Sequence, residues 1–127
     1  FEGEPARSLA ERRKKHSPLR DLAGMLRSFD YAARWSLQRV ARGRDKEAAL
    51  LEPAAEAWRR DSCRAFLHGY AASVAGKGLY GDWAAALRLL DLFVLEKACY
   101  ELRYELDQRP DQVQVPIHGL LAIVDAH

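Results

Sequence analysis

The chain has 127 residues, which suffices for one domain and is too short for two. Hydrophobic residues make up 49% and charged residues 30%, a balance typical of a soluble globular protein and not of a disordered chain. The net charge of +2 is too small to indicate a nucleic-acid partner, and no apolar run reaches the roughly 18 residues of a membrane span or forms a signal peptide.

The first predicted helix follows an N-terminal loop. Residues 1–16 show no sustained apolar periodicity, so we expect a loop there. Ser17 followed by Pro18 is a typical helix start, because a serine hydroxyl caps free amides and proline suits the first helical position. Apolar residues then recur at helical spacing, which predicts a helix over 17–42. These residues are Leu19, Leu22, Leu26, Phe29, Ala33 and Leu37.

The segment 45–74 is predicted as a broken pair of helices. Asp45 can cap its start. Pro53 lacks an amide hydrogen and clashes with the preceding turn, so we expect a break or kink there. Three glycines between residues 76 and 81 then indicate a connector.

A long helix is predicted over 82–106. Asp82 can cap its start, and Pro110 lies beyond its end, where a stop signal is expected. The helix is apolar almost all round between Leu89 and Cys99. This pattern indicates that it is buried on several sides.

The chain ends in a short predicted helix over 116–125, opened by Pro116. We therefore expect a mainly α fold, a single helical segment of four or five helices after an N-terminal loop, with no strand. Cys63 and Cys99 have no metal-ligand spacing, and both are expected to be buried, reduced thiols.

Five blocks of the chain carry a resemblance to a known family. They are 1–5 (FEGEP), 17–33 (SPLRDLAGMLRSFDYAA), 89–106 (LLDLFVLEKACYELRYEL), 107–111 (DQRPD) and 115–120 (VPIHGL). Together they resemble bacterial maltokinases, which belong to the aminoglycoside-phosphotransferase-like kinases. The resemblance implies the helical C-terminal part of a kinase-like C-lobe. In that family a metal-binding Asp precedes the FEGEP segment, and here the sequence starts just after that position.

The resemblance also implies an activity. Maltokinases convert ATP and maltose to ADP and maltose 1-phosphate with Mg²⁺, in cytoplasmic trehalose-to-glycogen metabolism, sometimes associated or fused with trehalose synthase. The His-Gly-Asp loop with the catalytic base and the lysine that grips ATP are expected upstream, so this segment alone is expected to be inactive. Two alternatives remain open: a kinase of the same fold with another small hydroxylated acceptor, and a non-catalytic helical interaction module.

Two acidic residues are candidates for the catalytic region that the resemblance implies. Glu2 lies two positions after the missing Asp, in the metal- and activation-loop-like segment 1–16, and is the candidate metal ligand; the alternative is an exposed loop acid. Asp21 matches the helix-start aspartate that supports the catalytic loop from behind by accepting backbone amides. As an alternative, Asp21 is a first-turn acid stabilised by the helix dipole.

The long helix carries the candidate sugar-binding residues, which we call the acceptor stripe. Its members share one helical face, with Glu96 and Arg103 beside them. Charged groups and tyrosines suit the hydroxyls and apolar faces of a sugar, and the stripe resembles the maltokinase acceptor region. The alternative is an ordinary Lys97–Glu101 pair beside half-buried tyrosines. The stripe comprises Phe93, Lys97, Tyr100, Glu101 and Tyr104.

Overall fold

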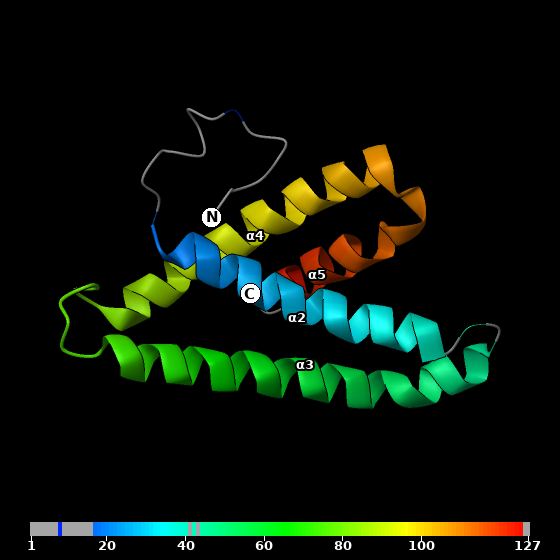
Figure 1. Ribbon diagram of the computed structural model, residues 1–127, viewed down its shortest axis with the longest axis horizontal. Coiled ribbons are helices and arrows are strands. Elements are labelled where there is room, and N and C mark those ends of the chain that lie inside the picture. Colours follow the sequence, from blue (N-terminus) through cyan, green and yellow to red (C-terminus); the bar gives the residue numbers. More distant parts are fainter. Residues whose placement is uncertain (1–7, 9–16, 41, 43, 126–127) are drawn as a thin grey trace.

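The computed structural model describes residues 8, 17–40, 42 and 44–125. These residues form four α-helices and one short 3-10 helix, and no strand occurs among them, which confirms the predicted mainly α fold. The elements are α2 (Leu19–Val40), α3 (Asp45–Val74), α4 (Trp83–Gln108), η1 (Pro110–Gln112) and α5 (Gln114–Asp125) (Figure 1).

Helix α2 is the centre of the arrangement. It contacts each of the other three α-helices, with α3 along one side and α4 and α5 toward the other (Figure 1). Helix α5 folds back from the end of α4 and packs against both α4 and α2. Side chains of α2 therefore face three neighbours, and this helix can join groups from the whole bundle.

Two of the predicted helix starts have the expected caps. The Ser17 hydroxyl accepts a hydrogen bond from the Leu19 amide at 3.3 Å. The Asp82 carboxylate accepts hydrogen bonds from the amides of Ala84 at 2.9 Å and Ala85 at 3.2 Å. Each cap satisfies amides that the first helical turn leaves unpaired.

The structure differs from the prediction at Pro53. Helix α3 is one continuous helix of 30 residues that includes Pro53, and the segment 45–74 is not a broken pair. The missing amide hydrogen would have bonded to the carbonyl of Ala49. Both residues are exposed, so water can take the place of that donor and the helix continues. Asp45 is the first helical residue, and Arg44 occupies the cap position without a side-chain hydrogen bond to the amides of the first turn.

The segments after α3 agree with the prediction in outline and differ from it in detail. Gly76 and Gly78 have φ values of 71° and 65°, which glycine adopts without strain, in the connector between α3 and α4. The 3-10 helix η1 was not predicted, and α5 begins at Gln114, two residues before Pro116.

The apolar core lies where the first halves of α2 and α4 meet. Leu19, Leu22 and Ala23 of α2 pack there against Ala86 and Leu90 of α4. An aromatic group closes this end of the core, with ring centroids 5.5 to 6.3 Å apart; it consists of Tyr70, Tyr80 and Trp83. Burial of these side chains joins α2, α3 and α4.

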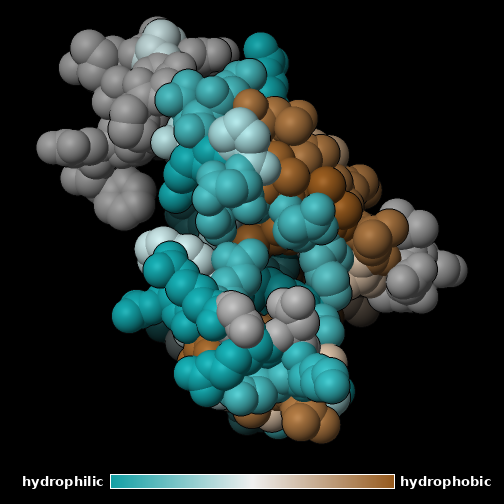
Figure 2. Space-filling view, turned by 90° about the vertical axis from the view of Figure 1, so that its right-hand side faces the viewer, coloured by the Kyte–Doolittle hydropathy of each residue, from teal (hydrophilic) through white to brown (hydrophobic). Residues whose placement is uncertain are grey.

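Helix α4 packs against α2 and α5, while other parts of its surface stay exposed among the described residues. Leu92 and Leu106 are 61% and 58% exposed, and Cys99 is exposed while Cys63 is half-buried, both as free thiols. Figure 2 looks onto one end of the bundle and shows a broad apolar area next to a hydrophilic one. None of the described helices combines the length and apolar character that crossing a membrane requires.

Candidate functional site

Of the two acidic candidates near the N-terminus, the structure describes Asp21 but not Glu2. Glu2 and the rest of segment 1–16 except Ser8 lie outside the described residues. Asp21 is exposed and lies in the first turn of α2, where the positive end of the helix dipole stabilises a carboxylate. Its predicted role in supporting a catalytic loop stays a prediction.

Arg20, the neighbour of Asp21, joins the start of α2 to the acceptor stripe. Its Nη2 donates to both carboxylate oxygens of Glu96 at 2.9 Å. The guanidinium also lies over the ring of Phe93, with its carbon 5.2 Å from the ring centroid. Two of the five blocks that carry the family resemblance, 17–33 and 89–106, are therefore neighbours in the structure, although the contacting residues are 76 apart in sequence.

The other members of the acceptor stripe divide between surface and interior. Lys97 Nζ lies 5.1 Å from the centre of the Tyr100 ring, and Tyr104 is half-exposed beneath the guanidinium of Arg109. Glu101 instead points into the bundle, where Nε of Arg27 donates to its carboxylate at 2.7 Å. Only Tyr104 of the stripe is exposed, whereas Phe93, Lys97 and Tyr100 are half-buried and Phe93 packs against the apolar core. Glu101 joins an interior group.

That interior group is a charged cluster which the sequence analysis did not anticipate. We call it the Arg27 cluster, and it contains Arg27, Asp30, Tyr31, Arg59, Glu101 and Glu105. Arg27 lies at its centre and is only 1% exposed. It donates to Asp30 on its own helix and to Glu101 on α4. A buried arginine with two carboxylates satisfies the rule that buried charges are paired.

The cluster reaches α3 through Arg59. Its Nε lies 3.3 Å from Oδ1 of Asp30 and also donates to Glu56 at 3.0 Å. Asp30 therefore lies between two arginines from different helices. This arrangement ties the middle of α3 to the middle of α2.

The cluster also holds the end of α4. The Tyr31 hydroxyl donates to Oε1 of Glu105 at 3.0 Å, and Glu105 is 1% exposed. Arg109, in the cap position after α4, donates to both oxygens of Glu105 at 2.9 and 2.7 Å. The carboxylate of Glu105 is thus compensated by two donors despite its burial.

Burial sets the electrostatics of the cluster. It raises the pKa of Asp30 and of Glu101 above their ordinary values, and the charge of Arg27 opposes both shifts. The pKa of Tyr31 is raised by burial and by the nearby carboxylates of Glu101 and Glu105. At the rim, the hydrogen bond from Arg59 lowers the pKa of Glu56.

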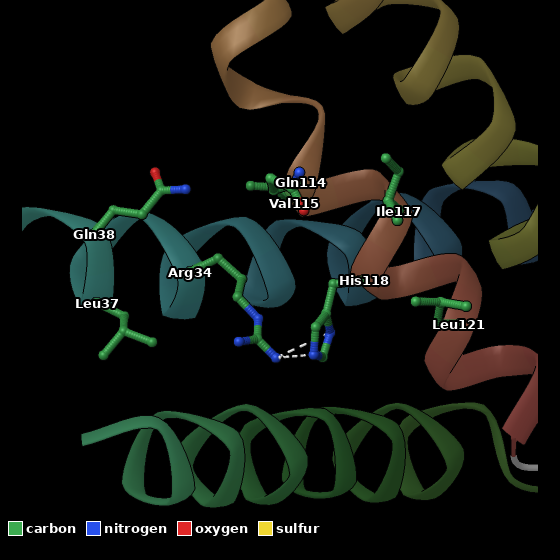
Figure 3. Close-up of a pocket in the computed structure, with 8 residues that line it drawn as sticks. All are labelled: Arg34, Leu37, Gln38, Gln114, Val115, Ile117, His118 and Leu121. Carbon is green, nitrogen blue, oxygen red and sulfur yellow. Dashed lines mark hydrogen bonds between the residues drawn. The ribbon is translucent and has the colours of Figure 1, made fainter. Parts of the chain in front are cut away.

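A shallow pocket lies next to the cluster, between α2 and α5 (Figure 3). Nη2 of Arg34 points at the ring of His118 and lies 2.9 Å from Nδ1, while its Nη1 donates to Glu52 at 2.6 Å. The pocket has a volume of about 240 Å³. Its lining is Arg34, Leu37, Gln38, Gln114, Val115, Ile117, His118 and Leu121.

The chemistry of these groups is that of binding and positioning. In the part of the chain that the structure describes, no three His, Cys, Asp or Glu side chains gather as a metal site would require. The Arg20 region offers one cation and one carboxylate on neighbouring helices, with the Phe93 ring beneath the cation. Such a pair can donate to hydroxyls and accept from them.

A scan against known protein-family models finds none that matches this chain. A function is therefore inferred from the residues and their arrangement. The Arg27 cluster left one signal in the sequence. Arg27 follows Ala23 by four residues on the buried face of α2, where a charged residue requires an opposite charge on a facing helix.

Proposed function

We propose that this chain forms the C-terminal helical part of the C-lobe of an ATP-dependent maltokinase, which transfers a phosphoryl group to maltose and yields maltose 1-phosphate. ATP, Mg²⁺ and the catalytic base would be held by residues preceding the described helices. The role proposed for these helices is to bind and orient the disaccharide. We place the activity in the cytoplasm, in α-glucan metabolism, with trehalose synthase as an associated or fused partner.

One observation carries the proposal. The Arg20 guanidinium binds Glu96 and covers Phe93, so the segment that resembles the kinase helix after the metal loop contacts the segment that resembles the acceptor region. A kinase needs this proximity, because the acceptor hydroxyl and the metal-bound phosphates must meet within a few ångströms.

The arrangement also suits a neutral, polyhydroxylated acceptor. Glu96 remains half-exposed while bound by Arg20, so its free lone pairs can accept from sugar hydroxyls. Tyr104 is exposed further along the same helix, with Arg109 over one face of its ring, and its other face can stack on a sugar ring. Glu101 is bound by Arg27 and is proposed to fix the orientation of α4 rather than touch the sugar directly.

The test is ADP release by the product of the complete reading frame that contains this sequence, with Mg²⁺, ATP and either maltose or a panel of other sugars and aminoglycosides. Maltose-dependent release supports the proposal. Release with a different acceptor retains the kinase and rejects maltose. Absence of release with every acceptor rejects the kinase and favours the helical interaction module.

A pair of variants on α4 tests the acceptor stripe. Lys97→Met is expected to raise the KM for maltose and leave the KM for ATP unchanged, because Lys97 is proposed to bind the acceptor and not the nucleotide. Arg88→Met is the matched control, an exposed cation on the same helix away from the stripe. An unchanged KM for maltose in Lys97→Met removes this residue from the acceptor site.

A further inference from the structure

Helix α4 carries a second stripe on the face that points away from the bundle. We call it the outer stripe, and every member of it is exposed. Helix α4 forms one edge of the described bundle (Figure 1), and the described helices leave this face exposed except at Glu96, which Arg20 of α2 binds. Its residues are Ala85, Leu89, Leu92, Glu96, Cys99, Arg103 and Leu106.

The spacing of the outer stripe is that of a coiled-coil seam. Its members are separated alternately by four and three residues, the pattern of successive a and d positions in a heptad repeat. The adjoining positions Leu95 and Leu102 are half-buried and apolar, and they widen the seam. A helix face with this period fits a second helix of the same period along its whole length.

The charges in the seam indicate which helix can pair with it and whether the pair is parallel or antiparallel. Leu92 precedes Cys99 by seven residues and Leu106 follows it by seven, while Glu96 precedes it by three and Arg103 follows it by four. The stripe is therefore close to symmetric about Cys99, with an acid on one side and a base on the other. A second copy of this chain, turned antiparallel, matches this pattern.

We propose that two copies of this chain associate through the outer stripe of α4, antiparallel, about a two-fold axis at Cys99. Leu92 of each copy then packs against Leu106 of the other. Glu96 of one copy and Arg103 of the other are then offset by about 1.5 Å along the helix axis, and these long side chains can span that offset. A parallel pair would oppose Glu96 to Glu96 and Arg103 to Arg103, so like charges exclude it.

The interface is isologous, as in most homodimers, because the same patch serves both copies. It uses none of the members of the acceptor stripe, although Glu96 and Arg103 lie beside that stripe and Glu96 also binds Arg20. The inference does not depend on the kinase activity. A protein with no activity toward any acceptor could still form this dimer.

The first test is the mass of the complete protein by sedimentation equilibrium. We expect twice the mass of one chain. Leu92→Asp is expected to raise the dissociation constant of the dimer at least tenfold, whereas Leu121→Asp is expected to leave it unchanged. Leu121 is the matched control, since it is 56% exposed but lies on α5, outside the stripe. Circular dichroism verifies that both variants remain folded.

The second test fixes the direction of pairing. A short bismaleimide should join two copies through Cys99, and Cys99→Ser should abolish the product while Cys63→Ser retains it. Arg103→Glu should weaken the dimer about as much as Leu92→Asp, and Arg103→Lys should not. A monomer at the highest soluble concentration overturns the proposal, and so does a dimer that Leu92→Asp and Arg103→Glu both leave intact.

Discussion

Gly119 of α5 lies directly against the guanidinium of Arg27 on α2. A Cβ built on Gly119 overlaps Nη1 of Arg27 and comes within 3.0 Å of Nη2. Asp30 and Glu101 hold the guanidinium from its other sides, so it cannot retreat freely. The absence of a side chain at residue 119 is what lets α5 close over the charged cluster.

Gly119→Ala is therefore expected to destabilise the fold. Insertion of a methyl group into a filled, constrained site costs about 1–3 kcal/mol. The free energy of unfolding in urea measures the effect. Gly69→Ala is the matched control: residue 69 is an exposed glycine inside α3 with no atom near its Cβ position. That substitution should stabilise the helix by about 0.5–1 kcal/mol. Equal midpoints for the two variants would contradict the contact.

Removal of Arg27 tests the charged cluster itself. Arg27→Met leaves the carboxylates of Asp30 and Glu101 in the interior without their shared cation, which should cost about 3–5 kcal/mol at neutral pH. Because burial already raises the pKa of both carboxyl groups, they become neutral as the pH falls. The deficit relative to the wild type should therefore shrink at mildly acidic pH.

A double variant separates the stability lost with the charge pair from the stability lost with the packing of the arginine side chain. Arg27→Met combined with Glu101→Leu removes both partners of one buried pair, and it should recover part of the stability lost by Arg27→Met alone. Unfolding curves of the single and double variants give the comparison. A double variant less stable than either single variant would show that the cluster contributes through packing alone.

The successful sequence predictions were those with local causes. Ser17 and Asp82 cap helices through amides two or three residues away, so the sequence around them contains the whole interaction. Apolar spacing likewise placed Leu19 and Leu22 on the buried face of α2. Such features depend on a few neighbouring residues; the cap expected from Asp45 was the exception, since Asp45 lies inside α3.

The failures had causes that a single segment does not contain. Whether Pro53 breaks a helix depends on whether the carbonyl of Ala49 can reach water, and this in turn depends on which side of α3 packs on α2. Arg27 and Glu101 are 74 residues apart, and their pairing requires the relative rotation of two helices. Spacing assigned Glu101 to a surface stripe, whereas the packing of α2 and α4 turns it inward.

The pH dependence of stability should contain a contribution from Glu56. The hydrogen bond from Arg59 lowers the pKa of this carboxyl group in the folded state. A carboxyl group with a lowered folded pKa stabilises the protein above its ordinary pKa of 4.5 and loses that contribution as the pH falls through the lowered value. Glu56→Gln should thus flatten the acid limb of the stability profile, measured by urea unfolding from neutral to acid pH.

A control removes the general effect of a lost surface charge. Glu47→Gln also deletes one acid of α3, and its partner Arg44 is exposed, so the pair contributes little. The acid limb of this variant should follow that of the wild type. If Glu47→Gln and Glu56→Gln flatten the profile equally, the bond between Glu56 and Arg59 is not its cause.

Arg20→Ala distinguishes the proposed acceptor site from a purely structural contact. The Arg20–Glu96 pair is partly exposed, so its loss should lower the free energy of unfolding by about 1 kcal/mol or less. If Arg20 positions Glu96 and Phe93 for a sugar, the same variant should raise the KM for maltose severalfold while the KM for ATP stays unchanged. Steady-state kinetics of the complete protein provide both constants.

Arg64→Ala serves as control, because Arg64 is an exposed cation on α3, far along the chain from either partner. A loss of stability without a change in the KM for maltose would leave Arg20 as a link between α2 and α4 and would withdraw its region from the acceptor site.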